Sequence, residues 1–243
     1  MASVRHHAAH RSHTTPEQSR VMTTTELMTD LPQQKPRAWL LLAHGAGAPM
    51  TSPFMNEIAA LLAQRGIAVA RFEFSYMAGR RQDGKRRPPP KAERLTSEFE
   101  TAVKTLAGLP EANDLPLLIG GKSMGGRVAT LIADTLFERG SITGAVALGY
   151  PFHPPKKPDS LRTSHLEGLR TPLLIIQGER DPFGNRADVE GYTLSPQIRL
   201  SWGTDGDHDL GPRGGSGSTR KANLAAAAYS IAAFAQSLPP SGK

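Results

Sequence analysis

The sequence contains no cysteine, which excludes disulfide bonds, cysteine-ligated zinc and a cysteine nucleophile. It also lacks any apolar run of the roughly 18–20 residues that a membrane-spanning helix needs. The nearest candidate, residues 222–235, is rich in alanine and is interrupted by Asn223 and Ser230, so it predicts a buried helix. The N-terminus has no apolar stretch typical of a secretory signal. These absences predict a cytoplasmic protein with no membrane contact.

Acidic residues are fewer than basic ones: Lys and Arg number 29, Asp and Glu 22, and the formal net charge is +7. The excess is local, because residues 80–94 hold seven basic and two acidic side chains. No aromatic residue lies among these charges, whereas proteins that bind single-stranded nucleic acids stack bases on aromatic rings. We therefore expect no nucleic-acid partner, although a nucleic-acid-binding module that uses this segment stays open as an alternative.

The chain length of 243 residues suffices for one sizeable core and is short for two. Residues 1–35 have no helical or strand period, which predicts a flexible N-terminal tail, and residues 36–239 are predicted to form one domain. The tail contains His6, His7, His10 and His13, which could chelate a metal. The simpler interpretation is a disordered histidine-rich tail, and we expect no metal.

Apolar runs and helical periods alternate along the predicted domain. The runs predict strands at residues 39–43, 67–74, 115–120, 142–148, 172–177 and 197–202. The helical periods lie at residues 53–65, 91–107, 124–138 and 220–238. This alternation predicts an α/β fold with a mostly parallel sheet of about six strands and helices on both faces. The loops that follow the strands then share the edge where such sheets bind ligands.

Residues 120–126, GGKSMGG, admit two interpretations. A phosphate-binding loop of the form GxxxxGK[ST] would need glycine where Pro116 stands, and its spacer would lie in a strand instead of an open loop. The pattern G-x-S-x-G, formed by Gly121, Ser123 and Gly125, instead predicts a sharp strand-to-helix turn that exposes the serine hydroxyl. Side chains at the two glycine positions would collide. The preceding strand and following helix favour the second interpretation.

A nucleophilic serine needs a histidine base and a carboxylate that orients the histidine. On sheets of this kind the chain order is serine, acid, histidine. His208 is the one histidine beyond the later predicted strands. For the acid we prefer Asp181, because Pro182 fixes its turn, and Glu179 is the alternative.

The reaction also needs hydrogen-bond donors for the oxyanion. One candidate is the backbone N–H of Met124, the residue after the serine. The other comes from the small-residue loop after the first predicted strand, where we assign the N–H of Ala46, with Gly47 next. His44 is expected to brace this loop and not to react.

Together, the segments LLLAHGAGAPM, GGKSMGGRVAT and LLIIQGERDPFG resemble the α/β-hydrolase superfamily, and more narrowly its dienelactone-hydrolase-like members. The resemblance covers residues 37–238 and implies a Ser123–Asp181–His208 triad, with no metal and no organic cofactor. It also implies a compact α/β-hydrolase fold without a large lid domain. The first two strands of the full superfamily sheet have no counterpart, unless the tail supplies them.

The expected function is therefore a serine hydrolase that cleaves a carboxylic ester, lactone or thioester through an acyl-enzyme on Ser123. A catalytically inactive interaction protein with the same fold is the alternative. Two groups of basic residues follow predicted strands: those of residues 80–94, and Lys156, Lys157 and Arg162. They suggest that a small-molecule substrate carries an anionic group. The alternative is that they form only a solvated, charged rim around the site. We expect Tyr76, Phe152 and Phe183 to form apolar walls of the substrate site, and the competing role for each is packing beneath the loops. The sequence does not predict an oligomeric state.

Overall fold

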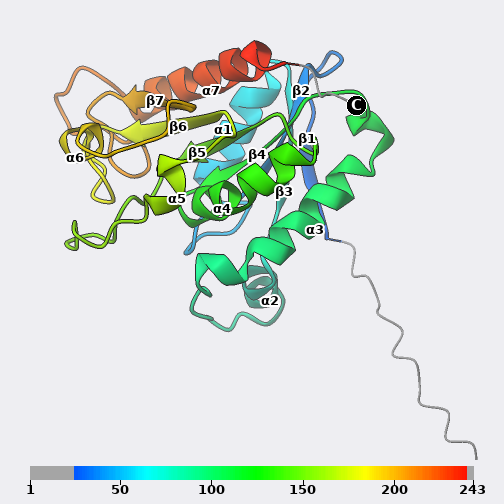
Figure 1. The fold of residues 1–243 in the computed structure, drawn as a ribbon, viewed down its shortest axis with the longest axis horizontal. Helices are drawn as coiled ribbons and strands as arrows, with labels where there is room; N and C mark the ends of the chain where they lie inside the picture. Colours follow the sequence, from blue (N-terminus) through cyan, green and yellow to red (C-terminus); the bar gives the residue numbers. More distant parts are fainter. Residues whose placement is uncertain (1–24, 240–243) are drawn as a thin grey trace, which may run out of the picture.

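The structure is a computed structural model that describes residues 25–239. Its single sheet has seven strands in the order β1-β3-β2-β4-β5-β6-β7 (Figure 1). The strands are β1 (Met28–Asp30), β2 (Ala38–Ala43), β3 (Ile67–Phe72), β4 (Leu117–Lys122), β5 (Gly144–Leu148), β6 (Leu173–Gly178) and β7 (Ile198–Gly203). All neighbouring strands are parallel except β1, which pairs antiparallel with β3. The predicted mostly parallel sheet is confirmed.

The predicted tail supplies one strand of the sheet, β1, an alternative that the sequence had left open, and the prediction of a flexible tail is wrong for this part of the chain. Three residues are too few to show a strand period, so the signal lies in tertiary contacts. Asp30 of β1 accepts hydrogen bonds at 3.0 and 2.8 Å from the guanidinium of Arg71 on β3. Arg71 is almost fully buried and also donates to Met50 O and Asn56 Oδ1. The four tail histidines lie outside the described residues.

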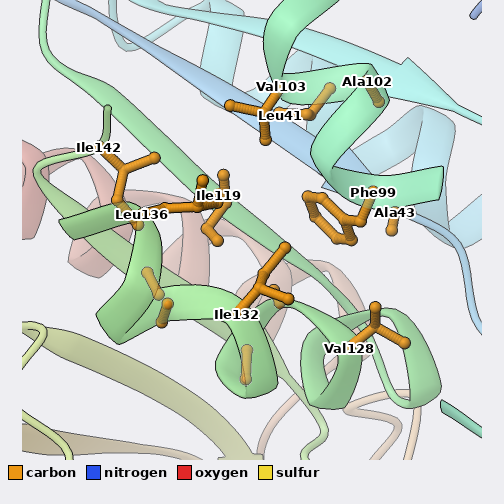
Figure 2. Packing of buried hydrophobic residues seen from close by; sticks show 14 of the residues in the cluster. Leu41, Ala43, Phe99, Ala102, Val103, Ile119, Val128, Ile132, Leu136 and Ile142 are labelled. Carbon is orange, nitrogen blue, oxygen red and sulfur yellow. The ribbon is translucent and has the colours of Figure 1, made fainter. Parts of the chain in front are cut away.

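Helices cover both faces of the sheet, as predicted. On one face lie α1 (Pro53–Ala63) and α7 (Arg220–Ser237), which pack on Leu40, Leu42 and Val146. On the other lie α3 (Thr96–Ala107) and α4 (Met124–Glu138), and Figure 2 shows Val103 of α3 beside Leu41 and Leu136 of α4 beside Ile119. The sheet therefore has a hydrophobic core on each side, which holds its strand ends rigidly.

Three short helices and two 3₁₀ turns were not predicted. They are α2 (Ser75–Asp83), α5 (Ser164–Glu167), α6 (Arg186–Glu190), η1 (Ala92–Arg94) and η2 (Pro110–Ala112). The loop expected after the predicted strand at residues 67–74 instead begins with the helix α2, which is mostly polar and buries only Tyr76 and Met77. Helix α2 ends at Gly84, whose φ of 71° closes the last turn. The predicted helix at residues 91–107 divides into η1 and α3.

The carboxyl ends of the parallel strands meet at one edge, where the loops after β2, β4, β5, β6 and β7 emerge (Figure 1). The connection from β5 to β6 carries only the four-residue α5. The expected absence of a large lid domain is confirmed within residues 25–239. No helix in this range combines the length and hydropathy of a membrane span.

Candidate functional site

Ser123 occupies the turn between β4 and α4, and its backbone is strained. Its φ of 51° and ψ of −113° place it in a region that residues with a side chain rarely adopt. The turn is held against β5, because the Ser123 N–H donates to Leu148 O at 2.8 Å. The predicted sharp strand-to-helix turn is therefore present.

The glycines on either side of Ser123 are required by the close approach of the backbone. A Cβ added to Gly121 would lie 2.4 Å from the carbonyl carbon of Gly125. One added to Gly125 would lie 2.6 Å from both Ala43 O and His44 O. The expectation that side chains at these positions would collide is confirmed.

Asp181 and His208 are brought together from different loops. His208 Nδ1 lies 2.8 Å from Asp181 Oδ2, and Asp181 is completely buried. The carboxylate also accepts the Phe183 N–H at 2.9 Å and the Gln177 side-chain amide at 3.0 Å. The alternative acid, Glu179, binds the Asp205 N–H and Arg186 instead. Of the two carboxylates, only Asp181 therefore lies in a position to orient the histidine.

The His208 ring lies close to Gly149, at the carboxyl end of β5 that the Ser123 turn also contacts. Leu148, which accepts the Ser123 N–H, is followed by Gly149, and a Cβ added to Gly149 would lie 3.2 Å from His208 Cε1. Because Nδ1 is bound to Asp181, the ring nitrogen left for a serine is Nε2. Among the described residues the Ser123 Oγ makes no hydrogen bond, and contacts of this kind are often long before substrate binds.

The N–H groups of all three candidate oxyanion donors, Met124, Ala46 and Gly47, have no acceptor within residues 25–239. His44 Nδ1 donates to Gly45 O at 2.7 Å, and the peptide that contains this carbonyl also contains the Ala46 N–H. Because a peptide is planar, this bond fixes the direction of the Ala46 N–H. The other His44 nitrogen accepts the Phe74 N–H at 3.2 Å. Burial lowers the pKa of His44, which favours this neutral, bracing form.

Tyr76 lies under the same loop. Its hydroxyl donates to Ala46 O at 3.0 Å, and burial raises its pKa, so it stays protonated as a donor. This bond fixes the peptide that carries the Gly47 N–H, the second-choice oxyanion donor. Tyr76 is nearly buried, so its contact with the loop is structural.

The predicted apolar walls divide between the core and the site. Phe152 is fully buried against Tyr150 and Tyr192, which fits the competing role of packing beneath the loops. It faces the core because Gly184, with a φ of 143°, lets the chain pass closely over its ring. Phe183 is partly exposed, and its ring centroid lies 4.3 Å from that of His208. Phe183 is therefore the one predicted aromatic wall that lies beside the histidine.

Two polar residues of the site were missed from the sequence. Gln177 is fully buried at the end of β6 and joins Asp181 to Tyr150, whose N–H it accepts at 2.8 Å. Lys122, the last residue of β4, extends its ammonium to His208 O. The available signal was a polar side chain at the end of an otherwise apolar strand, which marks both positions.

The basic residues beside the site differ in their surroundings. Lys156 and Lys157 are exposed, whereas burial and the charge of Arg127 lower the pKa of Arg162. Arg80, on α2, approaches the loop that follows β2, with Nη1 3.5 Å from Gly47 O. Arg80 is thus the basic side chain of residues 80–94 that reaches the candidate site.

Comparison with known proteins agrees with the observed fold. A family model described as an alpha/beta hydrolase domain matches residues 36–236. The fold is similar to a dienelactone hydrolase from Anabaena variabilis, with 22% identity over 89% of this chain and 94% of that one, and a TM-score of 0.65. It is similar to Est1E from Butyrivibrio proteoclasticus, whose structure holds ferulic acid, with 14% identity, coverage of 86% and 93%, and a TM-score of 0.59. It is also similar to a serine hydrolase without a lid from Xanthomonas campestris, with 15% identity, coverage of 86% and 85%, and a TM-score of 0.57.

Proposed function

Because this chain belongs to the alpha/beta hydrolase family, we propose that it is a serine hydrolase that cleaves a carboxylic ester, lactone or thioester. The nucleophile is Ser123, the base His208 and the orienting acid Asp181. The observation that carries the proposal is the 2.8 Å contact between His208 Nδ1 and the buried Asp181 carboxylate, at the strand edge that also presents Ser123 in a strained turn.

In the first half-reaction, Ser123 Oγ attacks the carbonyl carbon and its proton passes to His208 Nε2. The carbonyl oxygen becomes an oxyanion, to which the N–H groups of Met124 and Ala46 donate. Collapse of this intermediate breaks the bond to the leaving group, which takes the proton from His208. The acyl group remains on Ser123.

In the second half-reaction, a water molecule attacks the acyl carbon and gives its proton to His208. The second oxyanion collapses, the Ser123 oxygen leaves and takes that proton back, and a carboxylic acid is released. Asp181 stays ionised throughout and stabilises the imidazolium that forms in each half-reaction. Its three hydrogen bonds hold it in the required orientation.

We further propose that the substrate carries an anionic group. The support is the position of Arg80 beside Gly47 O, at the loop assigned to the oxyanion. A guanidinium there attracts an anion without being part of the reacting set.

The Ser123→Ala variant tests the reaction. We expect turnover of p-nitrophenyl acetate to fall by about 10³-fold or more, because the nucleophile is removed. A fluorophosphonate probe should label the wild-type protein at Ser123 and leave the variant unlabelled. Ser141→Ala is the matched control, because Ser141 is exposed and lies at the start of the β5 segment, away from the turn.

Turnover that survives in Ser123→Ala would assign the activity to another group. A folded wild-type protein that neither turns over esters nor reacts with the probe would favour the non-catalytic interaction protein.

A further inference from the structure

Lys122 is buried beside the candidate histidine, at the position directly before Ser123. Its side chain is 8% exposed, and its Nζ donates to His208 O at 2.8 Å. The same ammonium lies 3.2 Å from Asp209 Oδ1 and faces the ring of Phe54 at 5.2 Å from the centroid. A buried lysine is costly unless its charge is paired, so this placement calls for a physical reason.

The loop of residues 204–210 is fixed on either side of His208 by other contacts. Gly206 O accepts the Arg180 N–H at 2.8 Å, which joins the loop to the end of β6. The Asn223 amide on α7 donates to Thr204 O and Leu210 O, both at 2.9 Å. Neither contact reaches the backbone of His208 itself, which is held by Lys122.

Lys122 and Ser123 are consecutive residues, so the cation that holds the histidine is rigidly connected to the nucleophile. Both the Lys122 Nζ and the His208 Cε1 lie close to one point on Gly149, at 3.1 and 3.2 Å from a Cβ added there. The Lys122 ammonium thus lies near the imidazole ring of His208 and also binds the backbone carbonyl of the same residue.

We propose that Lys122 is a positioning residue that holds His208 at the nucleophile through its carbonyl and, with Asp209, sets the electrostatic surroundings of the imidazole. This inference rests on the proposed function for its catalytic consequence, whereas the contact with the His208 loop exists independently of any activity. The charged groups that face the ammonium are Asp209, Asp181 and Asp207. Burial lowers the pKa of Lys122, and these three carboxylates partly offset that effect.

The first test is Lys122→Met, which keeps the side-chain length and removes the charge and the donor. We expect kcat for p-nitrophenyl acetate to fall by about 10- to 100-fold with KM changed little, because the base is misplaced while the binding surface is intact. Amide hydrogen exchange of residues 204–210 should become faster. Lys104→Met, at an exposed position on α3, is the matched control and should change neither quantity.

The second test uses the pH profile of Lys122→Met and of Asp209→Asn, and the second of these variants leaves Lys122 in place. Loss of the cation favours the imidazolium, so the acid limb of the pH profile of kcat/KM should move to higher pH in Lys122→Met, by about half a unit. In Asp209→Asn, a change on a side chain that is 63% exposed, a negative charge is lost and the acid limb should move the opposite way. A packing role for Lys122 predicts no such opposed shifts.

Unchanged hydrogen exchange together with a kcat within twofold of wild type in Lys122→Met would overturn the proposal. If that variant does not fold, an acid limb unmoved by Asp209→Asn would overturn it. A wild-type protein without esterase activity or probe labelling would count against the proposed function only, and the exchange rates would still decide whether Lys122 holds the loop.

Discussion

The backbone of Ser123 can keep its strained conformation because the residues two positions away on each side have no Cβ. Gly121 and Gly125 pass so close to neighbouring backbone that any side chain would overlap carbonyl atoms that cannot move independently. The strain is therefore maintained by packing of main chain on main chain. The strictest requirement that the site places on single residues is therefore glycine at positions 121 and 125.

Gly121→Ala should destabilise the protein by about 1–3 kcal/mol, because the added methyl forces β4 away from α4. The variant should also lose ester turnover and probe labelling, since the turn that exposes Ser123 would open. Urea denaturation measures the free energy of unfolding. Gly168→Ala is the control, because a Cβ there meets nothing within 4 Å, and its effect should stay within about 0.5 kcal/mol. Equal stability of Gly121→Ala and wild type would contradict the steric argument.

A site residue could be predicted from the sequence when the feature that identifies it lies in a short stretch of the chain or in the order of residues along it. The motif around Ser123 and the chain order of Asp181 and His208 are sequence features, so these residues could be proposed without coordinates. Gln177 and Lys122 could not, because each acts through contacts with residues more than twenty positions away, Tyr150 and His208. A polar side chain ending an apolar strand indicates a buried polar role but does not name its partner.

At the scale of elements, α4 connects the candidate nucleophile to the far end of the sheet. Its Asp134 accepts hydrogen bonds from the Arg170 and Thr171 N–H groups, at 3.0 and 2.8 Å, and from the Thr171 hydroxyl at 2.7 Å. These bonds fix the chain just before β6 begins. The helix that starts at Ser123 thus also sets the entry into the strand that leads to Asp181.

Asp134→Asn should lower the free energy of unfolding by about 1–3 kcal/mol at pH 7. Burial raises the pKa of Asp134, but the hydrogen bonds from Thr171 and Arg170 outweigh it and leave the pKa lowered. The carboxylate therefore stabilises the fold above its ordinary pKa of about 4 and loses this effect as the pH falls through the lowered value.

The difference between variant and wild type should accordingly shrink in urea denaturation at about pH 3. Asp159→Asn, at an exposed position, should show no such pH-dependent difference. If the difference in the free energy of unfolding between Asp134→Asn and wild type does not change with pH, the charge of Asp134 does not contribute to stability.

Elements with a strong hydrophobic period could be predicted, and those held by polar contacts could not. The six parallel strands and the long helices have apolar faces that the sequence displays directly. In contrast, β1 depends on the pair between Asp30 and Arg71, and the polar helix α2 is anchored by Ser75, whose N–H and hydroxyl both bind Glu98. Such contacts join distant parts of the chain and leave no periodic pattern.

At the scale of the whole molecule, the net charge of +7 is unevenly neutralised. Within residues 80–94, Arg81 pairs with Glu26 and Glu73, and Arg87 pairs with Asp83. The other basic side chains of this segment form no ion pair within the described part of the chain: Arg80, Lys85, Arg86, Lys91 and Arg94. The segment begins on α2, where Arg80 approaches the candidate oxyanion loop. One unpaired cation of this segment, Arg80, therefore lies at the edge that presents Ser123.

This arrangement predicts a salt dependence that only a charged substrate shows. For a p-nitrophenyl ester with a free carboxylate, kcat/KM should fall about 3- to 10-fold between about 50 and about 500 mM NaCl, because salt screens its attraction to the segment. For neutral p-nitrophenyl acetate it should stay nearly constant. Arg80→Gln should weaken the salt effect for the anionic ester, whereas Lys104→Gln, at the exposed position on α3, should leave it unchanged. If both esters respond equally to salt, the basic segment is a solvated rim and does not select the substrate, since a neutral ester has no charge to be screened.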